Sequence, residues 1–519
     1  MSKKYIIFLI AVFTMHEAAF AFAVVSQGGA SAFAVGSQVD TSAIAEHAFL
    51  RNSSFPERIS NPALYGSAFK TSLSSLNFEY RYMHQGEAFI QQKGDGFMVA
   101  EVSADSYLHL SGNDTFWGAA SYHTGTKKHV RWNSSSDYEL LFPYILADST
   151  GGNLRSEQYC FSGGYAHTTG KISMGADFYF RSLHEYRKID PRPRNIISDL
   201  KAKTGAALSV GNRSLAAELG VIIYKQNGSV DFYNEQGVIE EYEMTGLGTY
   251  YSRFSGSKNS LYNKGIGWNA SLSLVPSAKE GGAYLLLSLS RERYERIAES
   301  FNSLPLTKLF KNNYSMRAGW RHSGANYFGV CDIYATFKCN NRKGVENIAG
   351  NASSSEYSVI AHLTMFKYRN TTESASFNLS FDKWFFSAEC GYADVCSKYV
   401  FPEREISFSK IYGNADCQRI IPVGKFTQID MRLSAGLYSN VKNNMIFPLA
   451  DMESSFIKMI EKSYKYFTAD YTLISLSCRM DYRRTNWKTG FYVAMCGREI
   501  LCSTNKSMFD VMASVGITF

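Results

Sequence analysis

Proline is scarce in this sequence: it supplies only 10 of the 519 residues, well below the average of about 5%. Long apolar runs are missing as well, and beyond residue 23 no segment approaches the roughly 18 consecutive apolar residues that a transmembrane helix needs. Proline is disfavoured inside sheets because it cannot donate a ladder hydrogen bond, so its scarcity leaves room for many strands. The sequence therefore argues against a helical membrane anchor after residue 23 and favours a chain dominated by β-strands.

The sequence signatures of common enzymes are also absent. There is no G-x-S-x-G nucleophile elbow, no H-E-x-x-H metal motif, no phosphate-binding loop and no G-x-G-x-x-G. The histidines are scattered, and His109 and His123, which flank one predicted turn, are the pair from which a site assembled across strands would be built. We expect them to be ordinary residues of a solvated wall, and we predict no catalytic residues and no cofactor.

Cysteine is present without the pattern of a metal site or a disulfide framework. The chain has nine cysteines, an odd number, and no C-x-x-C pair. Their spacing predicts no metal site and no disulfide framework, although Cys390 and Cys396 are placed to bridge a loop. The net charge is +8 without any run of five basic residues, so nucleic acid is not an expected partner. The excess charge indicates ordinary solubility, with a lumen or loops that attract anions as the alternative.

The first 23 residues have the pattern of a secretory signal peptide. A basic start precedes an apolar run over residues 5–13, and two Ala-x-Ala tripeptides end at Ala21 and Ala23. The apolar run is too short to cross a bilayer as a helix. We therefore predict export and cleavage after Ala21 or Ala23.

From about residue 74 to the end, short segments alternate between apolar and polar side chains. Phe and Tyr, which favour strands, are abundant, with 36 and 34 copies. In residues 429–437, apolar Ile429, Met431 and Leu433 alternate with Asp430 and Arg432. A charged residue at every second position suits a wall with lipid on one side and water on the other. The pattern therefore predicts membrane-spanning strands.

The connections between these segments come in two sizes, as in outer-membrane barrels with short periplasmic turns and long outer loops. Long connections are expected near 125–156, 187–201, 296–311, 339–354 and 439–466. We predict an all-β fold over residues 74–519, a transmembrane antiparallel β-barrel of about 20 strands within a range of about 18–22. This count includes segments 229–236 and 238–254. The apolar parity flips at Asp382–Lys383, which indicates a bulge or a turn.

The last strand has apolar residues at alternate positions up to the final residue of the sequence, namely Phe519, Ile517, Val515, Ala513 and Val511. This end resembles the assembly signal of Gram-negative outer-membrane β-barrels, a final strand with apolar alternate positions and a terminal Phe. In that signal a Gly often lies five residues before the end, whereas here that place is Ser514 and the glycine is Gly516. The resemblance implies the outer membrane of a Gram-negative bacterium, with membrane lipid and the barrel-assembly machinery as partners.

Residues 24–73 precede the first predicted strand and are rich in Ala, Ser and Gly. The element Asn61-Pro62-Ala63 in this arm is similar to the N-terminal hatch of outer-membrane long-chain fatty-acid transporters. It also resembles the start of an uncharacterised family of outer-membrane β-barrel proteins from Bacteroides-like bacteria, a resemblance that would cover nearly the whole mature chain. We expect the arm to be either a periplasmic extension or a small plug in the barrel.

Residues 451–464 break the strand pattern. Met452, Phe456, Met459 and Ile460 recur at helical spacing, and Asp451 is placed to cap the first turn. We predict a short amphipathic helix in an outer loop, which either packs on the barrel rim or serves as a lid or a partner surface.

The functional hypothesis follows from the predicted size of the barrel. A barrel of about 20 strands must either conduct or be plugged, because side chains alone do not fill its bore. We therefore expect a channel or substrate-selective transporter for an unidentified small solute, and not an enzyme. The alternative is a surface-exposed adhesin or outer-membrane enzyme that acts through its long outer loops.

Overall fold

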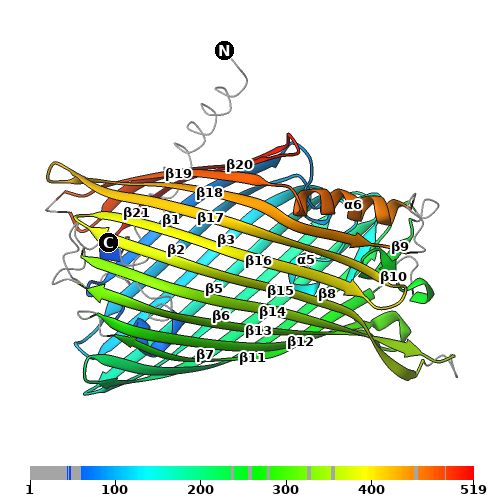
Figure 1. Cartoon of the computed structure of the whole chain (residues 1–519), viewed down its shortest axis with the longest axis horizontal. Helices are drawn as coiled ribbons and strands as arrows, with labels where there is room; N and C mark the ends of the chain where they lie inside the picture. The colour runs from blue at the N-terminus through cyan, green and yellow to red at the C-terminus, as the bar shows by residue number, and fades with distance from the viewer. Residues whose placement is uncertain are drawn as a thin grey trace, which may run out of the picture.

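The protein forms a closed antiparallel β-barrel of 18 strands (Figure 1). The computed structural model describes residues 44, 46–47, 60–234, 239–254, 260–276, 281–323, 329–351, 357–448, 454–484 and 487–519. The wall strands are, in chain order, β1 (Leu73–Gln85), β2 (Gly96–His109), β3 (Asp114–Val130), β5 (Gly152–Thr169), β6 (Ile172–Arg187), β7 (Arg192–Val210), β8 (Arg213–Asp231), β11 (Ser260–Pro276), β12 (Gly282–Ala298), β13 (Leu304–Ser323), β14 (Val330–Ala349), β15 (Val359–Phe381), β16 (Trp384–Tyr399), β17 (Arg404–Val423), β18 (Thr427–Ile446), β19 (Tyr471–Tyr482), β20 (Gly490–Cys502) and β21 (Ser507–Thr518). No helix in this part of the chain is long and apolar enough to cross a membrane.

The barrel closes where its first and last strands meet. Phe78 of β1 lies opposite Val515 of β21. The backbones of Ser74 and Phe519 exchange two hydrogen bonds, with N···O distances of 2.9 and 3.0 Å. The C-terminal segment is therefore the strand that completes the hydrogen-bonded ring, and its role as an assembly signal stays a prediction.

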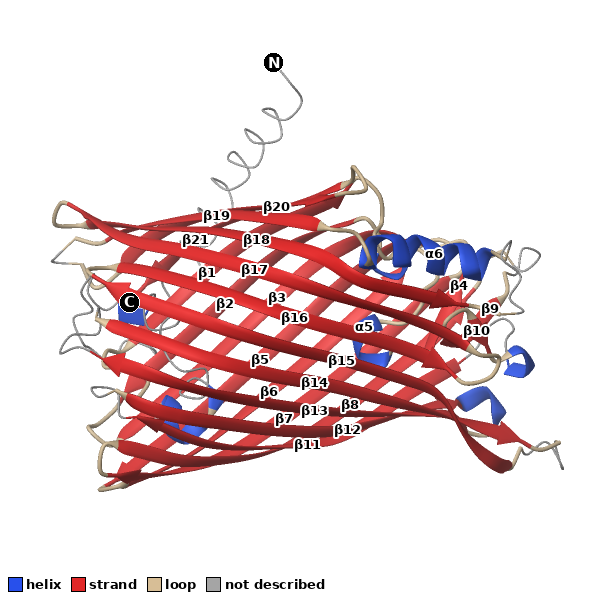
Figure 2. Cartoon of the chain, in the orientation of Figure 1, coloured by secondary structure: helices blue, strands red, loops and turns tan. Residues whose placement is uncertain are grey.

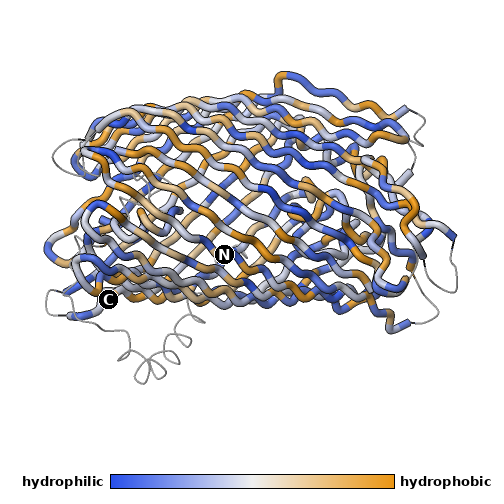
Figure 3. The backbone as a smooth tube through the Cα atoms, turned by 90° about the horizontal axis from the view of Figure 1, so that it is seen from below, coloured by the Kyte–Doolittle hydropathy of each residue, from blue (hydrophilic) through white to orange (hydrophobic). Residues whose placement is uncertain are grey.

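The predicted alternation separates the two faces of the wall. Along β8, outward-facing Leu219 and Val221 are 65% and 52% exposed, whereas inward-facing Glu218 and Tyr224 are 6% and 2% exposed. Figure 3 shows apolar and polar positions alternating along the strands. Apolar side chains thus form the outer surface, while charged residues point into the barrel.

Two of the 20 predicted strands do not belong to the wall. The segment predicted at 229–236 begins inside β8, which ends at Asp231, and the segment predicted at 238–254 follows it in the chain. The second of them contains β9 (Glu241–Gly246) and β10 (Thr249–Tyr250), which form a separate three-stranded sheet with β4 (Ile145–Asp148). Nearly every residue of β9 is buried, whereas a wall strand keeps one face open. The prediction was wrong because a short segment of mixed polar and apolar residues looks the same whether it lies in a wall or in an interior.

The wall strands are also longer than predicted, up to 23 residues in β15. Residues 187–201, predicted as a long loop, hold only a short connection at 188–191, after which β7 begins. Residues 192–201 are mostly polar although they are in a strand, because this part of β7 continues to pair with β6 and β8 beyond the apolar part of the wall. The parity change at Asp382–Lys383 is a tight turn between β15 and β16, and both residues have positive φ.

The two ends of the barrel differ. Residues 60–72, Phe519 and the two-residue turns at 170–171, 211–212 and 382–383 lie at one end, which we call the turn end. The opposite end, the loop end, carries the connections that contain α5 (Tyr138–Leu141) and α6 (Ser455–Phe467), as Figure 2 shows. The predicted helix is therefore present, but it begins at Ser455, and Asp451 and Met452 lie outside the described residues.

All nine cysteines are free thiols. Cys390 and Cys396 lie on the same strand, β16. Six residues of extended chain separate them by about 20 Å, so the predicted loop bridge between them is wrong.

Candidate functional site inside the barrel

A cap made from two connections and a helix lies inside the loop end. We define the loop-end cap as residues 131–151, residues 239–254 and α6. Leu141, Ile145 and Met244 of the cap pack against the inward-facing wall residues Leu183 and Tyr224. Met459 and Ile460 of α6 pack in a second cluster with Trp132 and Phe366. The cap thus places an apolar core across the bore of a barrel whose own inner wall is polar.

Three acidic residues of the cap each pair with an arginine of the wall. Asp137 accepts two hydrogen bonds from Arg181, at 3.0 and 2.6 Å. Asp148 of β4 accepts one from Arg187 at 2.6 Å, and both side chains have no exposed surface. Glu243 of β9 accepts two from Arg296 at 2.6 and 3.2 Å. A buried carboxylate is stable only with a charged partner close by. These three ion pairs therefore hold separate parts of the cap to the wall strands β6 and β12.

The cap encloses a cavity of about 460 Å³, which we call the loop-end pocket. Its walls are mostly apolar and come from the β1–β2 connection, the cap and β14–β17, including Trp132, Phe142, Val395, Phe408 and Met459. At its edge Lys93 and Glu139 form an ion pair, and both side chains are partly exposed. Arg342 anchors the adjacent segment by donating hydrogen bonds to the backbone carbonyls of Glu139 and Phe142 at 2.8 and 3.1 Å.

Helix α6 docks onto the β1–β2 connection through three contacts. Lys462 forms an ion pair with Glu87 at 2.5 Å, and the rings of Tyr466 and Phe89 stack with their centroids 4.4 Å apart. Gln92 donates a hydrogen bond to the sulfur of Met459 at 3.0 Å. The hydrogen bond from Lys462 lowers the pKa of Glu87, because it stabilises the charged carboxylate.

The arm enters the turn end of the barrel as a short helix, α4 (Pro62–Tyr65). Asn61 caps it by accepting a hydrogen bond from the backbone N–H of Ala63 at 2.9 Å, and its amide donates to the carbonyl of Ala217 on β8 at 3.1 Å. Two inward-facing glycines make room for this element. A Cβ added at Gly175 would lie 2.6 Å from the backbone of Pro62, and one at Gly205 would strike the Asn61 side chain.

Side chains of β2 and β3 hold the chain that follows α4. The Tyr107 hydroxyl donates to the carbonyls of Tyr65 and Gly66, each at 3.0 Å, and the Thr115 hydroxyl donates to Gly66 at 2.9 Å. His109 contacts the Phe69 carbonyl at 2.9 Å. His123 lies roughly 27 Å further along β3 than Thr115, the partner of His109. The two histidines therefore do not meet, and His109 positions the arm.

Between the arm and the cap, the inner wall is polar and its charges are paired. Examples are Arg81 with Asp510 at 2.5 Å, Arg432 with Asp416 at 3.0 Å, and Lys203 with Asp177 at 3.4 Å. A cavity of about 290 Å³ lies here, lined by polar side chains that include Glu218, Asn269, Asn313 and Arg317. In the described part of the chain, no three His, Cys, Asp or Glu residues are arranged to hold a metal ion. The mixed charge does not favour the anion-attracting lumen.

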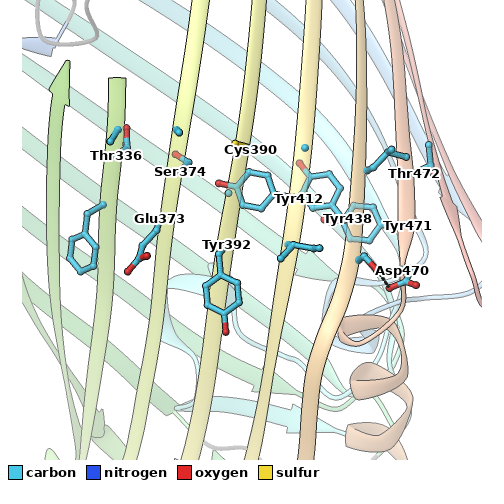
Figure 4. A pocket seen from close by; sticks show the side chains of 18 of the residues that line it. Thr336, Glu373, Ser374, Cys390, Tyr392, Tyr412, Tyr438, Asp470, Tyr471 and Thr472 are labelled. Atoms are coloured by element: carbon cyan, nitrogen blue, oxygen red, sulfur yellow. Dashed lines mark hydrogen bonds between the residues drawn. The ribbon is translucent and has the colours of Figure 1, made fainter. Parts of the chain in front are cut away.

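A larger groove of about 1330 Å³ crosses the wall from β13 to β20 (Figure 4). Its floor is a row of small residues at neighbouring register positions, namely Ala318, Ala335, Ala375, Cys390 and Gly413. Ile411 and Leu437 beside it are 52% and 65% exposed. Tyr412, Tyr438 and Tyr471 have the opposite parity and stack on one another, with centroids 5.5 and 4.3 Å apart. The groove therefore belongs to the apolar outer surface and is separate from the lumen.

Asn61, Pro62 and Ala63 lie against the inner face of strands β6–β8, so this element of the arm is inside the barrel. The predicted cleavage residues Ala21 and Ala23 lie outside the described residues. The three cap–wall pairs and the loop-end pocket were missed by sequence reasoning. Their members are ordinary charged and apolar residues scattered over the chain, without a shared motif.

Residues 62–519 match the model of a family described as "Family of unknown function (DUF6850)". A comparison with curated protein sequences gives no match. Similar solved structures include the ferric preacinetobactin receptor BauA from Acinetobacter baumannii, with 7% identity over 86% of this chain and 80% of that chain and a TM-score of 0.43. They also include the ferric citrate transporter FecA, with 10% identity over 87% and 79% and a TM-score of 0.34, and the copper transporter OprC, with 8% identity over 86% and 80% and a TM-score of 0.38. These likenesses concern the barrel and assign no ligand to this chain.

Proposed function

The chain belongs to a family of unknown function, DUF6850, and from its geometry we propose that it is a substrate-selective transporter of the outer membrane. One observation carries this proposal. The barrel has an apolar outer face and a polar, ion-paired inner face, and its own chain narrows the bore at both ends. A wall of 18 strands leaves space for solutes unless something obstructs it. The arm and the cap are such obstructions, and they are built from segments that are not wall strands.

The location and partners are part of the same proposal. The outward apolar side chains contact outer-membrane lipid, and the strand that ends at Phe519 is recognised by the barrel-assembly machinery. Residues 1–23 act as a signal peptide that is removed after Ala21 or Ala23. Residues 24–73 act as a small plug at the periplasmic side, with Asn61, Pro62 and Ala63 as its hatch element. The protein comes from a Bacteroides-like bacterium.

A double substitution tests whether the arm is a barrier. Leucine at Gly175 and Gly205 would occupy the space of Asn61 and Pro62, because even a Cβ at either position clashes with them. We expect Gly175→Leu/Gly205→Leu to displace α4 and to raise the ion conductance of the purified protein in planar lipid bilayers. The double variant should also speed the swelling of proteoliposomes in arabinose. The parent protein should conduct little in both assays.

Gly497→Leu is the matched control. Gly497 lies on β20, faces outward and has no atom within 4 Å of an added Cβ, so this variant should conduct like the parent. Heat-modifiable gel mobility verifies that each variant forms a barrel. A double variant that folds but conducts no better than the parent would show that displacing residues 60–72 does not by itself open the bore.

A further inference from the structure

The loop-end pocket contains buried oxygen atoms that have no hydrogen-bond partner. Gln92 is 8% exposed and uses its amide nitrogen on Met459, while its Oε1 is unpartnered. Ser397 on β16 is 7% exposed, and its Oγ has no partner. The Oδ1 atom of Asn370 on β15 is likewise buried and unpartnered. All three residues line the same cavity, although they come from three different elements.

Such atoms are unfavourable in a folded protein. A polar atom that leaves water without gaining a hydrogen bond loses its solvation, so few remain in native interiors. One unpartnered oxygen is explained by local packing alone. Three such oxygens around one apolar cavity form a set of acceptors that hydrogen-bond donors of a bound molecule would satisfy.

The remaining walls define what kind of molecule fits. Aromatic and aliphatic side chains dominate, including Trp132, Phe142 and Phe408. The charged residues at the edge are occupied by one another, since Lys93 pairs with Glu139. The guanidinium of Arg342 donates to backbone carbonyls and lies 5.3 Å from the Tyr368 ring centroid. The charged side chains of this pocket are therefore already engaged within the protein.

We propose that the loop-end pocket is the recognition site of the transporter and that its substrate is an uncharged, flat aromatic molecule bearing hydroxyl or amino donors. This inference rests on the proposed transport function. The volume of about 460 Å³ lies in the range of small-molecule sites and suits a molecule of two or three rings. Its donors meet Gln92, Asn370 and Ser397, and its rings lie against the aromatic walls.

Two probes with one scaffold test this assignment: quercetin, which carries five hydroxyl groups, and flavone, which carries none. Binding to the full-length protein in lipid nanodiscs is measured by isothermal titration calorimetry, with empty nanodiscs as the blank. We expect quercetin to bind at least roughly tenfold more tightly than flavone. Asn370→Leu and Ser397→Ala should each weaken quercetin binding by roughly three- to tenfold and leave flavone unchanged, because each removes one acceptor.

Asn378→Leu is the matched control. Asn378 lies on the same strand as Asn370 and also has a buried, unpartnered Oδ1, but it does not line the pocket. Equal affinity for quercetin and flavone, absence of quercetin binding, or an equal loss with Asn378→Leu would each overturn the inference. Heat-modifiable mobility shows that the variants fold. Gly175 and Gly205 do not line this pocket, so conduction by Gly175→Leu/Gly205→Leu without quercetin binding refutes the inference alone. Binding without conduction instead refutes the transport function.

Discussion

Removing Glu243 should open the loop-end cap while leaving the barrel intact. Glu243 lies on β9, and its carboxylate accepts two hydrogen bonds from Arg296 of the wall strand β12. Both side chains are only 4% exposed. In Glu243→Ala the guanidinium of Arg296 would still donate a hydrogen bond to the side-chain oxygen of Asn263 at 3.5 Å. It would lose the negative charge of Glu243 that compensates its own charge.

The expected cost is large for a single substitution. Breaking a buried ion pair by removing one partner costs about 3–5 kcal/mol, because the remaining charge is buried without compensation. Since about 1.4 kcal/mol changes an equilibrium tenfold, the ratio of open to closed cap should rise by roughly two to four orders of magnitude. The wall strands keep their own hydrogen bonds, so the opening should be local.

Hydrogen exchange and bilayer conductance measure this effect. Amides of β4 and β9 should exchange faster in Glu243→Ala, and the channel should spend more time in conducting states. Heat-modifiable mobility of the barrel should stay that of the parent.

Two controls accompany this variant. Glu243→Leu/Arg296→Met removes both charges and should restore most of the protection, because apolar side chains replace the pair without leaving a buried charge. Glu403→Ala removes an exposed partner of Lys398 and should change little, since surface pairs contribute about 0–1 kcal/mol. Unchanged exchange in Glu243→Ala, or a double variant that exchanges faster than the single one, would refute the view that this pair holds the cap.

Three further predictions concern assembly, pH and thiols. Phe519→Ala should sharply lower the amount of folded protein in outer-membrane fractions, because the chain offers a single terminal signal. The molecules that do insert should resist heat nearly as the parent does, since the loss of burial is about 3 kcal/mol; normal insertion would contradict the assignment. The pKa of Glu87 is lowered from 4.5 by the hydrogen bond from Lys462, so the docking of α6 should be fully present above about pH 4.5 and weaken as the pH falls through the folded-state pKa. Glu87→Gln should abolish this dependence in the hydrogen exchange of α6. Labelling with a thiol reagent after denaturation without reductant should modify all nine cysteines, and eight blocked thiols would contradict the free-thiol structure.

The barrel was predictable because its signal is local and repeated. A strand with lipid on one side and water on the other must alternate, so residues such as Ile429, Asp430 and Met431 reveal the wall without knowledge of their neighbours. The helix near Met459 was found in the same way, from its spacing. The excess strand at 238–254 arose where this signal is weakest, at β9, whose residues are buried on both faces and carry no alternation that distinguishes a wall from an interior.

The sequence by itself determined the fold class, the apolar outer face and the strand that ends at Phe519, because these depend on the order of residues along single strands. Only the tertiary structure decided where the arm and the loops lie and which charges meet. Glu243 and Arg296 are 53 residues apart in the sequence, and Gln92, Asn370 and Ser397 come from three elements. Contacts of this kind depend on the closure of the barrel, which brings distant segments into one bore, and no spacing along the chain encodes them.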